Sequence, residues 1–324
     1  MSERESIRLD ARPLWAWIAE RHAIYLRKAE RDGDRIPAWA STYARPPRLA
    51  DGQLTLDPVL AEYRFCNAFR ELDRVTVWIR ERIREPFAGS PYLWVMLAAA
   101  RAINWPPTLA ELIDRGAWPS DSRFDPRRMG KIMVARRDRG EKVETGAYMI
   151  RAESRPEAPW YSWPKGRYVA EVVVGRLWER RNEICAKLAG VNSIEAAVDL
   201  LWRDRELIGW GPFMAYEWAT DLRHTHHLRD AVDIMTWANP GPGARRGLNR
   251  LAGRDPRAPL RRGDAVELMR ELLAESRERG RLAPWVPALE MRDVEMSLCE
   301  VDKYLRVTSG QGRPRARYVP GRGC

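Results

Sequence analysis

The spacing of apolar residues is the feature that most restricts the fold of this chain. Apolar side chains recur every three or four residues along most of the sequence, which is the period of a helix with one buried face. Only short stretches such as Lys142 to Ile150 could be strands. With 324 residues and 45% hydrophobic content, the chain can bury a sizeable core. We therefore expect a mainly α protein.

The same periodicity locates the helices. The longest is expected from about Val59 to Arg84, and a capping box of Asn192 and Glu195 is expected to begin a later one. The other predicted helices are Leu14 to Glu30, Tyr92 to Ile103, Leu109 to Arg115, Pro126 to Arg139, Arg167 to Leu188, Ile194 to Arg205, Asp264 to Arg279 and Arg292 to Tyr304.

The charge of the chain indicates a polyanionic partner. The formal net charge is +11 and nearly all the cations are arginine, whose planar fork suits phosphate. A GC-rich genome would also favour arginine over lysine, but it would not explain the net charge. No apolar run approaches the roughly 20 residues that cross a bilayer. We expect a cytoplasmic protein that binds nucleic acid and no membrane.

The four cysteines do not predict a metal site. They are far apart in the sequence and form no C-x-x-C pair, so neither a zinc site nor an iron–sulfur cluster is expected.

A Gly-x-Gly turn joins two helical patterns in the stretch ELIGWGPFMAYEWATDL. Gly209, Trp210 and Gly211 match a helix-hairpin-helix, in which glycines allow positive φ and backbone N–H groups approach a DNA phosphate. An ordinary helix connection is the alternative. Asp221 follows Gly211 by ten residues, at the end of the second helix.

A second turn, NPGPGARRGLNR, places Gly241 and Gly243 before another helix. Arg245 and Arg246 follow in its first turn, where they oppose the helix dipole unless an anion compensates. The turn is therefore a second candidate phosphate site, unless both arginines point to solvent.

The expected helix from Val59 to Arg84 carries polar residues opposite its apolar stripe. Asn67, Arg70 and Arg74 lie on that polar face, and Asp73 with Arg74 could orient a substrate there. A solvated face is the alternative reading. The stripe itself consists of Phe65, Phe69, Leu72, Thr76, Ile79 and Ile83.

The last helix places two carboxylates, Glu295 and Asp302, on one stripe with Met291, Leu298 and Leu305. A buried carboxylate is costly without a partner, so each should meet an arginine, a metal or a ligand. The alternatives are structural ion pairs and a general base or amine-binding group.

Four motifs together resemble one family, that of the phage α-glutamyl/putrescinyl-thymine pyrophosphorylases, or amino acid:DNA transferases, which is related to the helical domain of hydroxymethyluracil DNA kinases. The resemblance covers about Tyr63 to Tyr318. The motifs are CNAFRELDRVTVWI at Cys66, GWGPFMAYEWATDL at Gly209, NPGPGARRGLNRLAGR at Asn239 and DVEMSLCEVDKYLR at Asp293.

The resemblance implies a helix-hairpin-helix, DNA-glycosylase-like fold and an amine transfer onto 5-pyrophosphomethyl-deoxyuridine in double-stranded DNA, with release of pyrophosphate. The amine would be an amino acid such as glycine, or a polyamine. The target base would be flipped out of the duplex. Mg²⁺ is compatible with the leaving pyrophosphate, although no ligand set is assigned. The 324 residues contain no G-x-x-x-x-G-K-[ST] motif, which favours a transferase over a kinase.

The candidate residues divide by role. The catalytic candidates are Asp221, Glu295, Asp302 and Asp73. The substrate or pyrophosphate candidates are Asn67, Arg70, Arg74, Arg245, Arg246, Lys303 and Tyr304, and the DNA-binding candidates are Gly209, Trp210, Gly211, Gly241 and Gly243.

The expected organisation is an N-terminal helix and linker over residues 1–58, a helical DNA-modifying domain over 59–308 with the hairpin at about 194–222, and a basic tail over 309–324. The location would be the host cytoplasm if a phage encodes the chain. Two other functions stay open, a DNA glycosylase that uses Asp221 and a non-catalytic DNA-binding protein.

Overall fold

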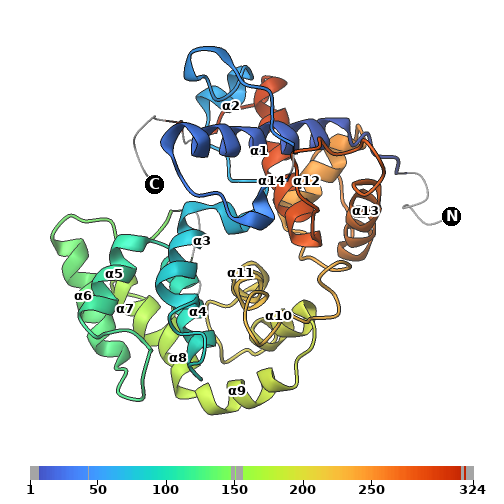
Figure 1. Cartoon of the computed structure of the whole chain (residues 1–324). Coiled ribbons are helices and arrows are strands. Elements are labelled where there is room, and N and C mark those ends of the chain that lie inside the picture. Colours follow the sequence, from blue (N-terminus) through green and yellow to red (C-terminus); the bar gives the residue numbers. More distant parts are fainter. Residues whose placement is uncertain (1–6, 43, 147–149, 151–155, 315–316, 319–324) are drawn as a thin grey trace. The chain divides into compact units, whose positions relative to one another are not determined.

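The computed structural model describes residues 7–42, 44–146, 150, 156–314 and 317–318 (Figure 1). The described residues contain helices and a single isolated β-bridge between Tyr63 and Arg317, so the prediction of a mainly α chain is confirmed. None of the helices in these ranges is both long and apolar enough to span a membrane. The chain divides into two compact units, which we call unit 1 (residues 1–73 and 234–324) and unit 2 (residues 74–233).

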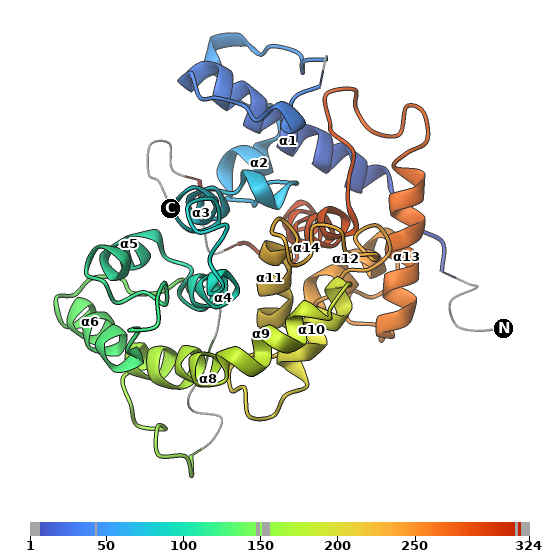
Figure 2. The same ribbon diagram turned by 60° about the horizontal axis from the view of Figure 1, so that its bottom comes forward.

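Unit 1 is built around its last helix. The helix α14 contacts each of the other α-helices of the unit (Figure 2). The α-helices of unit 1 are α1 (Arg12–Asp32), α2 (Pro58–Glu62), α12 (Pro242–Leu251), α13 (Arg262–Glu275) and α14 (Met291–Thr308), and its 3₁₀ turns are η2 (Ala38–Ala40), η3 (Ala50–Gly52) and η4 (Arg70–Leu72).

The helices α12 and α14 approach each other unusually closely because of two glycines. A Cβ on Gly247 would lie 2.3 Å from the carbonyl oxygen of Leu298, and one on Gly243 would lie 2.8 Å from Sγ of Cys299. No side chain fits at either position while the helices keep this separation. The two glycines therefore set the distance between α12 and α14.

Unit 2 surrounds the helix α4, in which every side chain is buried. The indole N–H of Trp218 in α11 donates to the carbonyl of Trp94 in α4 at 2.9 Å, which fixes these two helices. The elements of unit 2 are α3 (Arg74–Ile79), η5 (Arg80–Arg84), α4 (Leu93–Ile103), α5 (Pro106–Asp114), α6 (Pro126–Asp138), α7 (Lys165–Tyr168), η6 (Val169–Val174), α8 (Gly175–Glu179), α9 (Arg181–Ala189), α10 (Ile194–Trp202) and α11 (Pro212–Leu222); η5 and η6 are π-helical.

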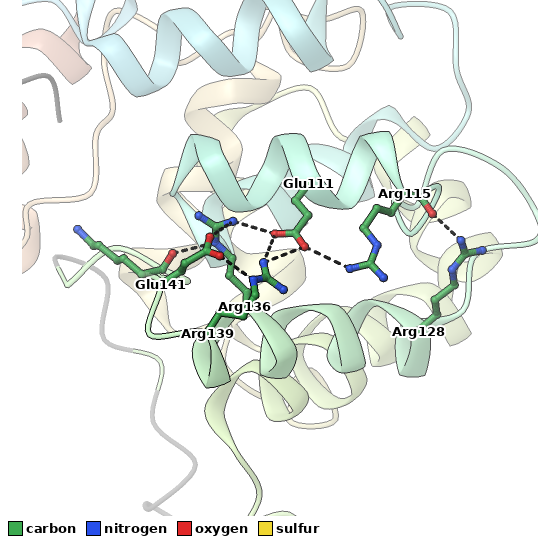
Figure 3. A network of polar contacts seen from close by, with 7 residues as sticks. Glu111, Arg115, Arg128, Arg136, Arg139 and Glu141 are labelled. Atoms are coloured by element: carbon green, nitrogen blue, oxygen red, sulfur yellow. Dashed lines mark hydrogen bonds and ion pairs between the residues drawn. The ribbon is translucent and has the colours of Figure 1, made fainter.

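A network of ion pairs joins α5 to the C-terminal end of α6. Glu111 accepts from Arg136 at 2.8 Å, from Arg139 at 3.0 Å and from Arg115 at 3.2 Å (Figure 3). Arg139 also pairs with Glu141 at 2.6 Å. The cations at this end of α6 are thus largely neutralised within the unit.

The predicted helix from Val59 to Arg84 is wrong. The chain there forms α2, an extended segment, η4, α3 and η5 in succession. All six residues of the predicted apolar stripe are buried, but Asn67 and Arg70, which were expected on the opposite face, are buried too, at 8% exposure each. Residues of the predicted apolar stripe and of the predicted polar face can both be buried here, because other elements of unit 1 surround the extended segment.

Most other helices begin and end within a few residues of their predicted bounds. The prediction from Arg167 to Leu188 is one exception, because the chain there contains η6 and a break at Arg180. The predicted capping box is also wrong, since Ser193 is the N-cap of α10 and accepts from the N–H of Ala196. Asp233 accepts from the next free amides, those of Ile194 and Glu195.

Several sequence predictions have no structural outcome. Residues 142–146 and 150 form no strand, and residues 147–149 lie outside the described residues. Much of the predicted basic tail, 315–316 and 319–324, lies outside them as well. The functional division at residues 58 and 308 stays a prediction, as does the glycosylase-like form of the fold.

Candidate active site

The predicted hairpin lies in unit 2, where α10 packs against α11. Gly209 has a φ of +88°, and a Cβ there would lie 2.9 Å from a methyl group of Val173. Gly211 is the N-cap of α11 with a φ of −64°, so the expectation of positive φ is wrong for that glycine. Trp210 is buried, and its Nε1 donates to the carbonyl of Val173 at 3.2 Å. The turn is thus anchored on η6, and its binding of DNA stays a prediction.

Asp221 lies in α11 with no exposed surface and forms a two-point ion pair with Arg101 of α4. The distances are 2.5 Å to Nε and 2.6 Å to Nη2. Arg101 also donates to Thr76 at 3.1 Å and to Asn104 at 3.2 Å. These contacts hold both charges inside unit 2 and give Asp221 a structural role; its predicted catalytic role has no test in the structure.

The second glycine turn begins α12 in unit 1. Gly241 is the N-cap with a φ of −65°, and its N–H lies 3.5 Å from Oε1 of Glu295. Gly243 faces Cys299 of α14, where only a glycine fits. Packing against α14 therefore accounts for Gly243 without a phosphate, and the DNA contacts predicted for both glycines stay predictions.

The arginines of α12 are compensated by groups of the protein. Nε of Arg245 donates to the carbonyl of Pro240 at 3.1 Å, and Nε of Arg246 donates to Oδ2 of Asp302 at 2.8 Å. Nε of Arg250 donates to Oδ1 of the same carboxylate, also at 2.8 Å. Asp302 is 3% exposed, so the expectation that this buried carboxylate meets arginine is confirmed.

Glu295 is half-buried on α14 beside the first turn of α12. The Sγ of Cys299 lies 3.6 Å from its Oε1, in addition to the N–H of Gly241. A carboxylate near a helix N-terminus is stabilised by the helix dipole. Burial, followed by the charge of Glu295, raises the pKa of the Cys299 thiol, so this sulfur is protonated at neutral pH.

A set of polar residues gathers where the extended segment of unit 1 meets α1 and α14. Glu300 on α14 accepts from the N–H of Cys66 at 2.9 Å and from Nζ of Lys303 at 2.6 Å. Lys303 also donates to the carbonyl of Arg64 at 3.0 Å. We call this set the α14 polar cluster, and its members are Arg21, Cys66, Asn67, Arg70, Asp73, Glu300 and Lys303.

Arg21 of α1 holds the same segment from the other side. Its Nε donates to the carbonyl of Cys66 at 3.0 Å, and its Nη2 donates to that of Phe65 at 3.3 Å. The charge of Glu300 is the main cause that raises the pKa of the Cys66 thiol, which is therefore a poor nucleophile at neutral pH. The chemistry of the cluster must come from its oxygen and nitrogen groups.

Asn67 and Asp73 lie next to each other, and their predicted roles at a substrate site stay predictions. The N–H of Asn67 donates to Oδ1 of Asp73 at 3.0 Å, and its side-chain amide donates to the carbonyl of Leu72 at 2.8 Å. Burial raises the pKa of Asp73 to about 6, against the opposing effects of the Asn67 N–H, Arg21 and Arg70. Arg74, by contrast, is exposed at the start of α3.

Lys303 and Tyr304 have separate surroundings. Nζ of Lys303 lies 4.4 Å from the centre of the Phe65 ring, within the α14 polar cluster. The hydroxyl of Tyr304 donates to Oδ2 of Asp57 at 2.5 Å. The other oxygen of Asp57 caps α2 by accepting from Val59 and Leu60. Tyr304 therefore joins α14 to α2, and a contact with substrate stays a prediction.

Arg292 and Asp293, a buried pair at the start of α14, were not among the residues predicted from the sequence. They are 6% and 7% exposed, and burial raises the pKa of Asp293 to about 7. The N–H of Glu290 donates to Asp293 at 2.9 Å as part of a capping box. An acidic N-cap followed three residues later by an acid was a local signal for this position. For Arg21 and Glu300, no local sequence pattern indicated that they contact the extended segment.

No group of three or more His, Cys, Asp or Glu residues in the described ranges is arranged to hold a metal ion. Glu300 of the α14 polar cluster already accepts from Lys303 and the Cys66 N–H. Glu300 is therefore held by hydrogen bonds and by the charge of Lys303.

Comparison with known proteins relates the chain to a phage DNA kinase. The chain matches the family described as "5-hmdU DNA kinase, helical domain" over residues 11–313. A curated relative, the 5-hmdU DNA kinase of Bacillus phage SP10, is 25% identical over 207 residues, which are 60% of this chain and 31% of the relative. No solved structure matches the chain. The resemblance drawn from the four sequence motifs is confirmed at this level: the chain belongs to the family of the 5-hmdU DNA kinase helical domain.

Proposed function

We propose that the protein modifies thymine bases in DNA by placing an amine on the 5-methylene carbon of 5-pyrophosphomethyl-deoxyuridine. Membership in the family supports the DNA substrate. The named relative is a kinase of 5-hydroxymethyl-deoxyuridine, and phosphorylation of that hydroxyl creates a leaving group on the same carbon. The net charge of +11 favours a DNA partner.

The proposed reaction is a displacement at the methylene carbon. The amine nitrogen forms a bond to that carbon, the bond from carbon to the pyrophosphate oxygen breaks, and pyrophosphate leaves with the electron pair. The attacking nitrogen must first lose a proton, since an ammonium has no lone pair. The site therefore needs a base and cations for the leaving group.

We assign the role of base to Asp73. The observation that supports this choice is the environment of its carboxylate, which raises the pKa. A pKa of about 6 leaves the carboxylate ionised at neutral pH while making it more basic than an ordinary aspartate. The N–H of Asn67 fixes one oxygen, which keeps the group in one orientation. Asp221 and Asp302 are less suited to the role because arginines occupy both of their oxygens.

Arg70 is the favoured pyrophosphate ligand. It is close enough to Asp73 to oppose the rise of that pKa, as Arg21 is too. Charges this near the base would also stabilise the oxygens of the leaving group. Arg246, 41% exposed, and Arg245 lie on α12 and stay secondary candidates for the DNA backbone, together with Glu295 as an amine-binding group.

The test is a mass measurement on digested DNA. DNA containing 5-pyrophosphomethyluracil is incubated with the protein and a mixture of amino acids and polyamines, and the nucleosides are separated by mass. The expected result is a nucleoside adduct together with free pyrophosphate. Asp73→Asn should abolish the adduct, while Asp230→Asn, a change at an aspartate with 90% side-chain exposure, should not.

Three outcomes would contradict the proposal. Release of free base would assign a glycosylase, and DNA binding without any product would assign a binding protein. Transfer of phosphate from ATP to hydroxymethyluracil DNA by this chain alone would assign a kinase.

A further inference from the structure

Two segments of unit 2 form a close antiparallel pair. A Cβ on Gly166 would lie 2.8 Å from Met133, and one on Gly130 would lie 3.3 Å from Cα of Arg167. Further along, a Cβ on Gly175 would lie 3.5 Å from Pro126. The continuous run of α7, η6 and α8 thus follows α6 in the opposite direction. Because the two segments pack against each other, we treat their exposed sides as one candidate surface.

Cations from both segments lie on this surface. Arg127 and Lys131 of α6 are exposed, and neither side chain has an ion pair within the described residues. Arg167 has 44% side-chain exposure and pairs with Glu171 at 3.0 Å. The opposite end of α6 is neutralised by Glu111, as Figure 3 shows. Positive charge is therefore concentrated at the N-terminal half of α6.

Two arginines of the second segment stack on tryptophans that precede this segment in the chain. The guanidinium of Arg167 lies 3.7 Å from the centre of the Trp163 ring, and that of Arg176 lies 5.4 Å from the centre of the Trp160 ring. Tyr161, which lies between the two tryptophans in the sequence, is 41% exposed. Aromatic rings and guanidinium planes beside cations are the groups on which unpaired bases stack.

The surface is continuous with the hairpin turn. Nη1 of Arg176 donates to the carbonyl of Glu206 in that turn at 3.4 Å. The turn also rests on Val173, through Gly209 and the indole N–H of Trp210. Both features therefore lie on the same run of helix within unit 2.

We propose that this surface binds DNA, holding phosphates with its cations and stacking an unpaired base on its aromatic rings. The proposal rests on the proposed function for its choice of DNA. Charge favours a polyanion, and the exposed ring of Tyr161, next in sequence to Trp160, favours nucleic acid over an acidic protein. We call it the arginine–tryptophan surface, made of Arg127, Lys131, Trp160, Tyr161, Trp163, Arg167 and Arg176.

The salt dependence of binding tests the cations. Affinity for a fluorescent DNA duplex is measured at several salt concentrations for the double variant Arg127→Ala, Lys131→Ala. The slope of log K against log salt should decrease by roughly one to two, since each lost phosphate contact removes about 0.9. The matched control is Arg277→Ala, Arg279→Ala, two exposed cations of unit 1, which should leave the slope unchanged.

A duplex with a short unpaired bubble tests the aromatic part. Tyr161→Ala should weaken binding to the bubble by roughly tenfold and leave binding to the intact duplex unchanged. An equal loss of affinity for both DNAs, or no loss for either, would overturn the proposal that a base stacks on this ring. An unchanged salt slope for the α6 double variant, or loss only of binding to polyglutamate, would overturn the assignment to DNA.

These results are separable from the test of the reaction. If the α6 double variant shows the expected slope change but the wild-type protein forms no adduct, the DNA-binding surface is supported and the proposed function is rejected. If the wild-type protein forms adducts but the α6 double variant keeps the wild-type slope and KM for DNA, the proposed function is supported and the DNA-binding surface is rejected.

Discussion

Asp221 and Arg101 form a two-point ion pair that is closed to solvent inside unit 2. Their side chains are 0% and 3% exposed, and both oxygens of the carboxylate face the guanidinium. Thr76 and Asn104 accept further N–H groups of the arginine. The pair joins α4 to α11 and therefore stands at the centre of the unit.

Replacing Asp221 should destabilise the protein more than it impairs any chemical step. Asp221→Ala leaves Arg101 buried without its counter-charge, a change that costs about 3 to 5 kcal/mol in comparable buried pairs. The unfolding free energy in urea should fall by about that amount. Asp230→Ala breaks an exposed pair with Arg229 and should cost less than about 1 kcal/mol. A folded Asp221 variant with wild-type stability and no activity would instead support catalysis by this carboxylate.

The helices of the chain could be predicted because their buried faces recur with helical period. The terminal helices, Arg12–Asp32 and Met291–Thr308, show that stripe clearly, and so does Pro126–Asp138. The segment from residue 63 to 73 could not be predicted in the same way. Its apolar residues happen to fit a helical stripe, while the groups that hold it extended, Arg21 and Glu300, lie 45 and 234 residues from Cys66.

For the candidate site, the sequence indicated individual residues but not their neighbours. Asn67 and Asp73 were proposed from an expected helix and Lys303 from a family motif; the structure places the three in one cluster, and their roles stay predictions. The partners of Asp221 and Asp302 were not identified, because ion pairs such as that of Arg101 and Asp221 join positions 120 residues apart. A single sequence can indicate that a buried charge requires a partner, but it does not identify that partner.

The rate of adduct formation should follow the ionisation of Asp73. With the pKa of this base raised to about 6, activity should be low at pH 5 and rise to a plateau above about pH 7. Asp73→Asn should lower the single-turnover rate by about 10² to 10⁴ and remove this rise. The measurement is a pH series at saturating DNA and amine. A wild-type rate that is constant from pH 5 to 8 would rule out Asp73 as the base.

Asp293 should make the protein less stable as the pH rises. Burial raises its pKa in the folded state to about 7, from an ordinary value of 3.8. Between these values the unfolded chain loses the proton first, so each pH unit costs the folded state up to about 1.4 kcal/mol. Asp293→Asn should flatten the dependence of unfolding free energy on pH in this window, since its amide oxygen can still accept from Glu290. An unchanged dependence would show that Asp293 is ionised when buried.

The separation of α12 and α14 should make Gly247 intolerant of even one added methyl group. A Cβ there would lie 2.3 Å from the carbonyl oxygen of Leu298, a backbone atom that cannot move away as a flexible side chain would. Gly247→Ala must therefore push the helices apart and disturb the ion pairs of Asp302 with Arg246 and Arg250. We expect a loss of at least about 2 kcal/mol, or a failure to fold.

Gly263→Ala provides the matched control for this prediction. Gly263 lies in α13 of the same unit, and nothing lies within 4 Å of a Cβ built on it. Alanine restricts the unfolded chain and favours the helix, so this variant should be more stable by about 0.4 to 1 kcal/mol. Urea unfolding of both variants should show opposite signs. A Gly247→Ala protein as stable as the wild type would mean that α12 and α14 lie farther apart than described, and that Asp302 is less tightly enclosed by its two arginines.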